Sequence, residues 1–224
     1  MATRSRTRKP LTKERVLEKA IALADKDGIE ALSMRKLGQA LGVEAMSLYN
    51  HVANKGELVA AMVDRVVEQF ELPDDEPRWD AAIRRCAVSA HDLLIAHEWA
   101  CTLALLPSDV RTVSGPRIRY MEWLLRRLRE AGFSAETTYH AYHVLDGHIF
   151  GFSVWETSHT YTDDEAAQLG AEFERITADG YPHVREHAEQ HATAGPHQQV
   201  RAFDFGLDLV LEGLRRIPRR TTAD

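Results

Sequence analysis

The chain has 224 residues, of which 44% are hydrophobic and 28% are charged, with a net charge of -6. This size and composition predict a globular protein with a full core, in one large domain or two domains. They argue against a membrane protein, because no apolar run approaches the roughly eighteen residues that a membrane span requires. The N-terminus also lacks the apolar segment of a signal peptide, so we expect a cytoplasmic protein.

Charge is distributed unevenly along the chain. Residues 1–72 carry 12 Lys+Arg and 10 Asp+Glu, whereas residues 73–224 carry 16 and 24. The first ten residues have no apolar period and are expected to be a disordered basic arm. Two interpretations of the arm remain open, a contact with nucleic-acid phosphates and an inert solvated tail.

Apolar residues at helical spacing predict four helices in the first third of the chain, at about 12–27, 33–40, 44–50 and 55–72. Thr12 and Ser33 are good N-caps, and Gly42 supplies a turn between the second and third helices. This order predicts a helix-turn-helix in which Leu48 points inward. The outer face of its third helix is short, polar and aromatic and consists of Ala45, Met46, Ser47, Tyr49, Asn50 and His51.

The acidic stretch from Pro73 to Pro77 marks a domain boundary, and every periodic segment beyond it again predicts helix. These helices are expected at about 79–97, in a short segment ending at Pro107, from near Pro116 to Gly132, and at about 134–159, 163–179 and 197–216. We find no strand alternation. The sequence therefore predicts an all-α protein, with a three-helix helix-turn-helix domain and its linking helix at 11–72 and a larger helical domain at 73–224.

The stretch ALADKDGIEALSMRKLGQALGVEAMSLYNHVANKGELVAAM resembles the DNA-binding domain of the tetracycline-repressor (TetR/AcrR) family of transcription regulators. Its Leu37-Gly38, Leu41-Gly42-Val43, Leu48-Tyr49-x-His51 and Asn54-Lys55 elements fall in the family register. The rest of the chain resembles the tetracycline-repressor-type C-terminal domain through its long glycine-containing helix, the stretch PHVREHAEQHA and the closing FDFGLDLVLEGL.

This resemblance implies a homodimeric repressor that binds a palindromic operator and is released by a small-molecule effector. Carried over to matching positions, the implied DNA contacts are Arg35, Ala45, Met46, Ser47, Tyr49, Asn50, His51 and Lys55. The family archetype has polar or rigid groups at the positions of Ala45 and Met46 and an aromatic at that of Asn50. The operator sequence therefore does not carry over.

Side-chain chemistry suggests how these contacts divide. The guanidinium group of Arg35 can donate to guanine O6 and N7 together, with a phosphate contact or a surface ion pair as the alternative. Ala45 and Met46 can touch only apolar surface such as a thymine methyl group, and Asn50 suits adenine or a phosphate. Lys55 lies at a helix N-terminus, where backbone N–H groups also attract anions. The hydroxyl and imidazole groups of the outer face either bind phosphates or pack partly against the first helix.

Two helices of the larger domain are expected to form the dimer interface that the family implies. Gly147 and Gly151 lie four residues apart on the long helix, a spacing that lets a partner helix approach closely. The final helix carries an apolar stripe of Phe203, Gly206, Leu207, Val210 and Leu214. The alternative for both sets is ordinary core within one chain.

The ligand pocket is expected among the helices between residues 79 and 159. Its candidate lining residues are His91, Trp99, Tyr120, Trp123, Leu124, His143, His148, Phe150 and Trp155. For each aromatic residue the alternative is plain core packing.

Neither a metal nor another cofactor is predicted. Two histidine sets have spacings that suggest zinc, but neither has a convincing further ligand in register. They are His140, His143, His148 with Asp146, and His183, His187 and His191. Cys86 and Cys101 have neither zinc nor disulfide-scaffold spacing and are expected to be reduced and buried.

Three other functions compete with a repressor. Ser33 and Lys36 have the spacing of a serine-lysine nucleophile pair, but a helix cap explains Ser33 better, and we find no convergent acid and base. An enzyme is therefore not expected. A transcriptional activator of the same fold and a small-molecule-binding protein without DNA function remain open alternatives.

Overall fold

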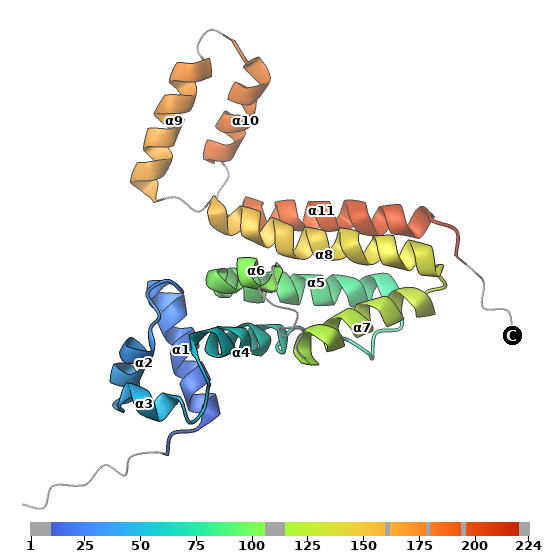
Figure 1. The fold of residues 1–224 in the computed structure, drawn as a ribbon. Coiled ribbons are helices and arrows are strands. Elements are labelled where there is room, and N and C mark those ends of the chain that lie inside the picture. Colours follow the sequence, from blue (N-terminus) through green and yellow to red (C-terminus); the bar gives the residue numbers. More distant parts are fainter. Residues whose placement is uncertain (1–9, 106–114, 160–161, 178–179, 194–195, 220–224) are drawn as a thin grey trace, which may run out of the picture. The chain divides into compact units, whose positions relative to one another are not determined.

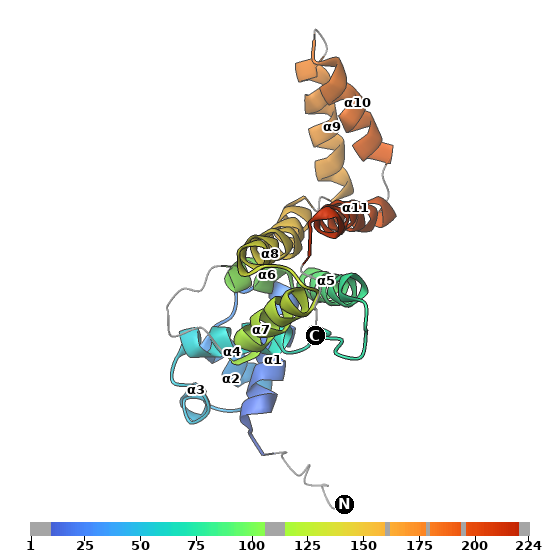
Figure 2. The same ribbon diagram turned by 90° about the vertical axis from the view of Figure 1, so that its right-hand side faces the viewer.

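A computed structural model describes residues 10–105, 115–159, 162–177, 180–193 and 196–219. These residues are arranged as helices, with no strand among them. They form two compact units (Figures 1 and 2). Unit 1 comprises the residues up to Phe70 together with Ala96–Tyr120, and unit 2 comprises Glu71–Ile95 and the residues from Met121 onward.

Unit 1 contains the four predicted N-terminal helices and one more. They are α1 (Lys13–Asp27), α2 (Met34–Leu41), α3 (Ala45–Leu48), α4 (Lys55–Val67) and α6 (Glu98–Leu105). The oxygens of Thr12, Ser33 and Asn54 accept hydrogen bonds from backbone N–H groups in the first turns of α1, α2 and α4. These caps confirm the predicted helix starts and explain Ser33 as a cap.

Unit 2 contains the other helices. They are α5 (Trp79–Ala96), most of α7 (Gly115–Glu130), α8 (Ala135–Ser158), α9 (Asp163–Thr177), α10 (Pro182–Thr193) and α11 (Pro196–Arg216). The helices α8 and α11 lie side by side, as do α9 and α10, which form an antiparallel hairpin (Figures 1 and 2). Among the described residues, no helix has the length and apolarity needed to cross a membrane.

The all-α prediction is confirmed, with differences in detail. Helix α3 is shorter than expected and ends at Leu48, after which the chain forms a turn as far as His51. Helix α10 was not predicted as a separate element, because its sequence is rich in polar residues and lacks a regular apolar stripe. The described residues 96–105 and 115–120, which the sequence analysis places in the larger domain, group with unit 1.

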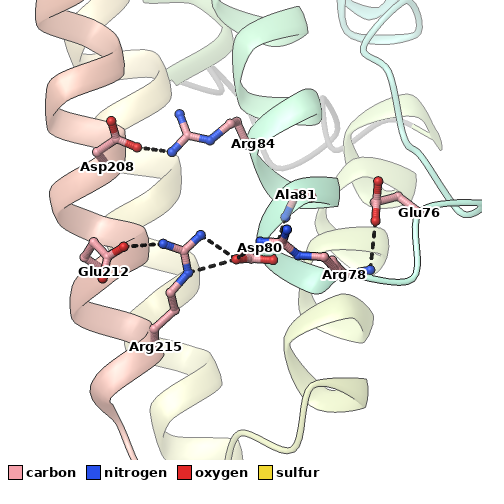
Figure 3. A network of polar contacts seen from close by, with 8 residues as sticks. All are labelled: Glu76, Arg78, Asp80, Ala81, Arg84, Asp208, Glu212 and Arg215. Carbon is pink, nitrogen blue, oxygen red and sulfur yellow. Dashed lines mark hydrogen bonds and ion pairs between the residues drawn. The ribbon is translucent and has the colours of Figure 1, made fainter.

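A charged network holds the last helix of unit 2 against α5 (Figure 3). Arg215 on α11 donates to Asp80 at the start of α5, with a distance of 2.8 Å from Nε to Oδ2, and Arg78 donates to the same oxygen at 3.0 Å. Arg84 and Asp208 form a second ion pair between α5 and α11. Burial alone would raise the pKa of Asp80, but these hydrogen bonds outweigh it and lower the pKa to about 2.

Candidate nucleic-acid interface

The geometry of α2 and α3 is fixed by two glycines. Gly42 ends α2 in the left-handed conformation (φ 69°), which a side chain would strain. A Cβ atom on Gly38 would lie 2.9 Å from the carbonyl oxygen of Val43 and 3.2 Å from the backbone nitrogen of Ala45. The two helices can therefore approach this closely only because Gly38 has no side chain.

The exposure of α3 and the following turn agrees with the predicted division into inner and outer faces. Leu48 is fully buried and anchors α3 in the core of unit 1. Met46 and Tyr49 are exposed, with 76% and 43% of their surfaces open to solvent. Asn50 is exposed as well, and the remaining predicted contacts, Ala45, Ser47 and His51, are half-buried. The structure thus brings these six residues together on one short segment.

The charged candidates on α2 and α4 are also accessible. Arg35 is exposed, and within the described part of the chain no carboxylate lies within ion-pair distance of its guanidinium. The neighbouring Lys36 instead pairs with Asp27 at 3.1 Å, so the ion-pair alternative considered for Arg35 applies to Lys36. Lys55 is exposed in the first turn of α4, beside the capping residue Asn54. The basic arm lies outside the described residues.

Helix α6 packs against the helices of this unit. Asp25 on α1 accepts two hydrogen bonds, from Trp99 Nε1 at 2.6 Å and from the ring Nδ1 of His97 at 2.8 Å. Tyr120 packs edge-to-face on Phe70, with ring centroids 5.7 Å apart. Two predicted pocket residues, Trp99 and Tyr120, therefore belong to the core of unit 1.

The other predicted pocket residues lie in unit 2 and do not share one environment. Trp123, Leu124 and Phe150 are buried, and Trp123 donates to Asp74 Oδ1 at 3.0 Å. In contrast, His143 and Trp155 are exposed on α8. Within unit 2, the predicted pocket residues therefore include both buried and exposed side chains.

The remaining two candidates, His91 and His148, belong to a buried polar cluster. The Ser153 hydroxyl donates to the Ile149 carbonyl oxygen at 2.8 Å, so its oxygen accepts from His91 Nδ1 at 2.9 Å. The other nitrogen of His91 faces Glu156 Oε2 at 3.3 Å. Burial, reinforced by His148, lowers the pKa of His91 to about 4, and burial raises the pKa of Glu156. The lowered pKa keeps the His91 imidazole neutral at neutral pH.

This cluster contains the residue types of a Ser-His-Glu catalytic triad but not the properties of one. Ser153 is fully buried, and its proton is donated to a backbone carbonyl instead of to the histidine. His91 stacks on Phe203 of α11 with ring centroids 3.9 Å apart. The cluster therefore joins α5, α8 and α11 in the core of unit 2.

The predicted dimer residues divide into two groups. Gly147 and Gly151 lie on an exposed face of α8, where an added Cβ atom would meet nothing within 4 Å. In contrast, the α11 stripe is already used within the chain, because Phe203, Leu207 and Leu214 are buried and Val210 is half-buried. The helices α11 and α8 approach each other closely at Gly206, since a Cβ atom added there would lie 2.5 Å from the His148 ring.

This burial corrects the predicted dimer face of α11. Among the described side chains of α11, the exposed large apolar ones are Phe205 and Leu209, which are 66% and 60% exposed. On α8, Val144 and Trp155 flank the two open glycines and are 52% and 42% exposed. We define these six residues, Val144, Gly147, Gly151, Trp155, Phe205 and Leu209, as the α8/α11 open face.

The histidine sets considered for zinc do not converge within the described residues, where no three His, Cys, Asp or Glu side chains are placed to hold a metal ion. His183 and His187 are exposed on α10, and the side chain of His191 lies outside the described residues. His140 and His143 are exposed, whereas His148 points toward the backbone of α11. Cys86 and Cys101 are buried and form no disulfide, as predicted, and burial raises the pKa of both thiols.

Comparison with known proteins covers both units. Residues 16–62 match the bacterial regulatory proteins of the tetR family, and residues 72–217 match the tetracyclin repressor-like C-terminal domain. The chain is 34% identical over 223 residues to the HTH-type transcriptional repressor DrrR1 of Streptomyces coeruleorubidus, an alignment that covers 94% of this chain and 80% of the relative.

Solved structures support the same assignment. The TetR family protein ActR of Streptomyces coelicolor, in complex with actinorhodin, aligns with a TM-score of 0.74 and 27% identity over 92% of this chain and 97% of that protein. BioQ bound to its double-stranded DNA operator aligns with a TM-score of 0.64 and 25% identity over 92% of this chain and 98% of that protein. These matches confirm the resemblance identified in the sequence. The chain therefore belongs to the TetR family of DNA-binding transcriptional regulators.

Proposed function

We propose that this regulator is a homodimeric repressor that binds a palindromic operator and leaves it when a small molecule binds unit 2. The observation that carries the proposal is the α8/α11 open face. It consists of large apolar side chains and two glycines that a single chain leaves in water. Burial of such side chains is worth about 1.5–3 kcal/mol each, so covering this face by a second copy is strongly favourable.

The two helices of the open face favour a twofold arrangement. Because α8 and α11 lie side by side, pairing them with their mates gives a four-helix interface in which the same surface faces itself. The glycines permit a partner helix to approach the α8 backbone closely. This arrangement retains Gly147 and Gly151 from the predicted interface and replaces the buried α11 stripe with Phe205 and Leu209.

A dimer also satisfies the geometry of DNA recognition. One helix-turn-helix covers one half-site, and two copies reach successive major grooves when they are about 34–36 Å apart. In each copy, the exposed residues of α3 and the following turn face base edges, with Arg35 on α2. Lys55 binds a phosphate at the start of α4. A twofold protein requires a palindromic operator.

Effector release is supported by the family and by its structural relatives. The ligand must bind more tightly to a conformation in which the two recognition helices no longer fit successive grooves. ActR is bound to actinorhodin in its crystal structure, which makes this compound the first one to test here. Repression is favoured over activation because the relative DrrR1 is a repressor.

The dimer is tested by light scattering coupled to size-exclusion chromatography. Gly147→Leu places a bulky side chain on the open face and should give a monomer that binds the operator at least tenfold more weakly. Gly170→Leu is the matched control, because Gly170 is also an exposed helical glycine with nothing within 4 Å of an added Cβ atom. A Gly147→Leu protein that remains dimeric contradicts the placement of the interface.

Operator binding and release are tested with duplexes selected from a random pool by the wild-type protein. We expect the selection to enrich a palindrome. Fluorescence anisotropy should then show release of this palindrome as effector candidates, beginning with actinorhodin, are added. If no sequence is enriched, the alternative of a small-molecule-binding protein without DNA function is correct. A reporter gene behind the selected operator separates repression from activation.

A further inference from the structure

Met46 is the most exposed large hydrophobic side chain among the described residues, with 76% of its surface open to solvent. It is the second residue of α3, and the N-terminal residues of a recognition helix are those that reach base edges. An apolar side chain gains nothing from water in this position. On a recognition helix, this exposure leaves the side chain free to contact DNA.

The chemistry of methionine restricts what that partner can be. Its thioether has no hydrogen-bond donor and is only a weak acceptor, so Met46 cannot read the donors and acceptors of the base edges. The major groove presents one apolar feature, the C5-methyl group of thymine. Tyr49 and Asn50 carry hydroxyl and amide groups that suit phosphates and hydrogen-bonding base edges. Ala45 is half-buried and lies against α2, so Met46 is the exposed apolar side chain on α3.

The backbone beneath Met46 is held firmly, as selective recognition requires. The neighbouring residue Ala45 lies directly against α2, within 3.2–3.3 Å of the Cβ position of Gly38. The turn before α3 is closed by a hydrogen bond from the Val43 N–H to the Gly38 carbonyl oxygen at 2.9 Å. The long, unbranched side chain of Met46 therefore extends from a fixed point and adapts at its tip.

We infer that Met46 reads a thymine methyl group in each half-site and is a specificity-determining residue for operator recognition. This inference rests on the proposed operator binding and adds the base that one side chain selects. It also has a consequence for modified DNA. A 5-methylcytosine at the same position presents its methyl group at the place where thymine does, so it should replace part of the contact.

The experiment removes one methyl group at a time from DNA. Each thymine of the selected operator is replaced symmetrically by deoxyuridine, which lacks the C5-methyl group but keeps every hydrogen-bonding group. At the position that Met46 contacts, wild-type affinity should fall about fourfold per half-site, and thus about sixteenfold for the symmetric pair, from the loss of one buried methyl each. At the other positions the effect should be small.

Protein variants assign the effect to the side chain. In Met46→Ala and Met46→Gln, the affinity ratio between thymine and deoxyuridine operators should fall close to one, whereas Met46→Leu should keep most of it. Arg35→Ala is the control, because it should weaken both operators equally and leave the ratio unchanged. Circular dichroism checks that each variant is folded. Because Met46 is exposed, its substitution should leave the core of unit 1 intact.

A second set of duplexes restores the methyl group alone. Replacing the contacted thymine by cytosine should weaken binding, and replacing that cytosine by 5-methylcytosine should recover about fourfold per half-site in the wild type but nothing in Met46→Ala.

The outcomes separate this inference from the proposed function. If the protein enriches no sequence, operator binding itself fails. If it binds a palindrome but no thymine responds to loss of its methyl group, only the role of Met46 is refuted. If the response persists in Met46→Ala, the methyl group acts through Ala45 or DNA stiffness, and the inference is again refuted.

Discussion

Gly38→Ala tests the helix-turn-helix most directly, because it adds one methyl group where α2 meets α3. The new Cβ atom would lie 2.9 Å from the Val43 carbonyl oxygen and 3.3 Å from the Ala45 Cα atom. These are backbone atoms, so α3 must shift by about 0.5 Å before the 2.9 Å contact becomes an ordinary van der Waals contact of 3.4 Å. Overpacking of this kind costs about 1–3 kcal/mol, and the gain of alanine over glycine in a helix offsets about 0.5–1 kcal/mol. We expect a net loss of about 1–2 kcal/mol in the free energy of unfolding.

The effect on operator affinity should exceed the effect on stability. Recognition requires side chains held to within about 0.5 Å, so displacement of α3 should weaken operator binding at least about tenfold in a protein that is still folded. Urea unfolding followed by circular dichroism gives the first quantity, and fluorescence anisotropy with the selected operator gives the second.

The matched control for this prediction is Gly170→Ala. Gly170 lies inside α9, where an added Cβ atom meets nothing within 4 Å. The substitution should stabilise α9 by about 0.5–1 kcal/mol and leave operator affinity unchanged. If Gly38→Ala behaves like this control in both assays, the close approach of α2 and α3 described above is incorrect.

Three further predictions concern unit 2, and urea unfolding measures each of them. The pKa of Asp80 is lowered to about 2, so its contribution to the free energy of unfolding is complete above pH 4 and is lost as the pH falls through 2. Asp80→Asn should remove about 2 kcal/mol at pH 7 together with this pH dependence. The pKa of His91 is lowered from its ordinary 6.5 to about 4, so as the pH falls the imidazole is protonated in the unfolded chain before it is protonated in the folded protein. The free energy of unfolding should therefore fall between pH 6.5 and pH 4, and His91→Gln should remove this loss. Gly206→Ala should destabilise the protein by about 1–3 kcal/mol, and adding His148→Ala should recover part of this loss, because the new Cβ atom meets the His148 ring.

The sequence was informative where local chemistry decides the structure. Thr12, Ser33, Asn54 and Ser134 each accept a hydrogen bond from the backbone three residues later, as N-caps do. Gly42 adopts a left-handed conformation at the predicted turn. Capping and turn formation depend on a few neighbouring residues, so the helix-turn-helix could be located without knowledge of the fold.

The prediction was weaker where distant residues decide the environment. The sequence around Trp99 does not reveal that its ring N–H donates to Asp25 on α1, and so it was assigned to the ligand pocket. In the same way, nothing near His91 in the sequence indicates that Ser153 and Glu156 face its two nitrogens. Such residues are predicted as pocket candidates because aromatic and imidazole side chains occur both in pocket walls and in the cores of domains.

The glycines of α8 and α11 show why spacing alone cannot identify an interface. Gly147, Gly151 and Gly206 lie inside helices, where glycine costs about 1 kcal/mol relative to alanine. Gly206 has its compensation within the chain, because the His148 ring occupies the space that a Cβ atom would need. Gly147 and Gly151 have no such neighbour within 4 Å. Spacing alone therefore does not distinguish a glycine packed within the chain from an open one, and the open pair, beside exposed Val144 and Trp155, is where we propose that a second copy of the chain packs.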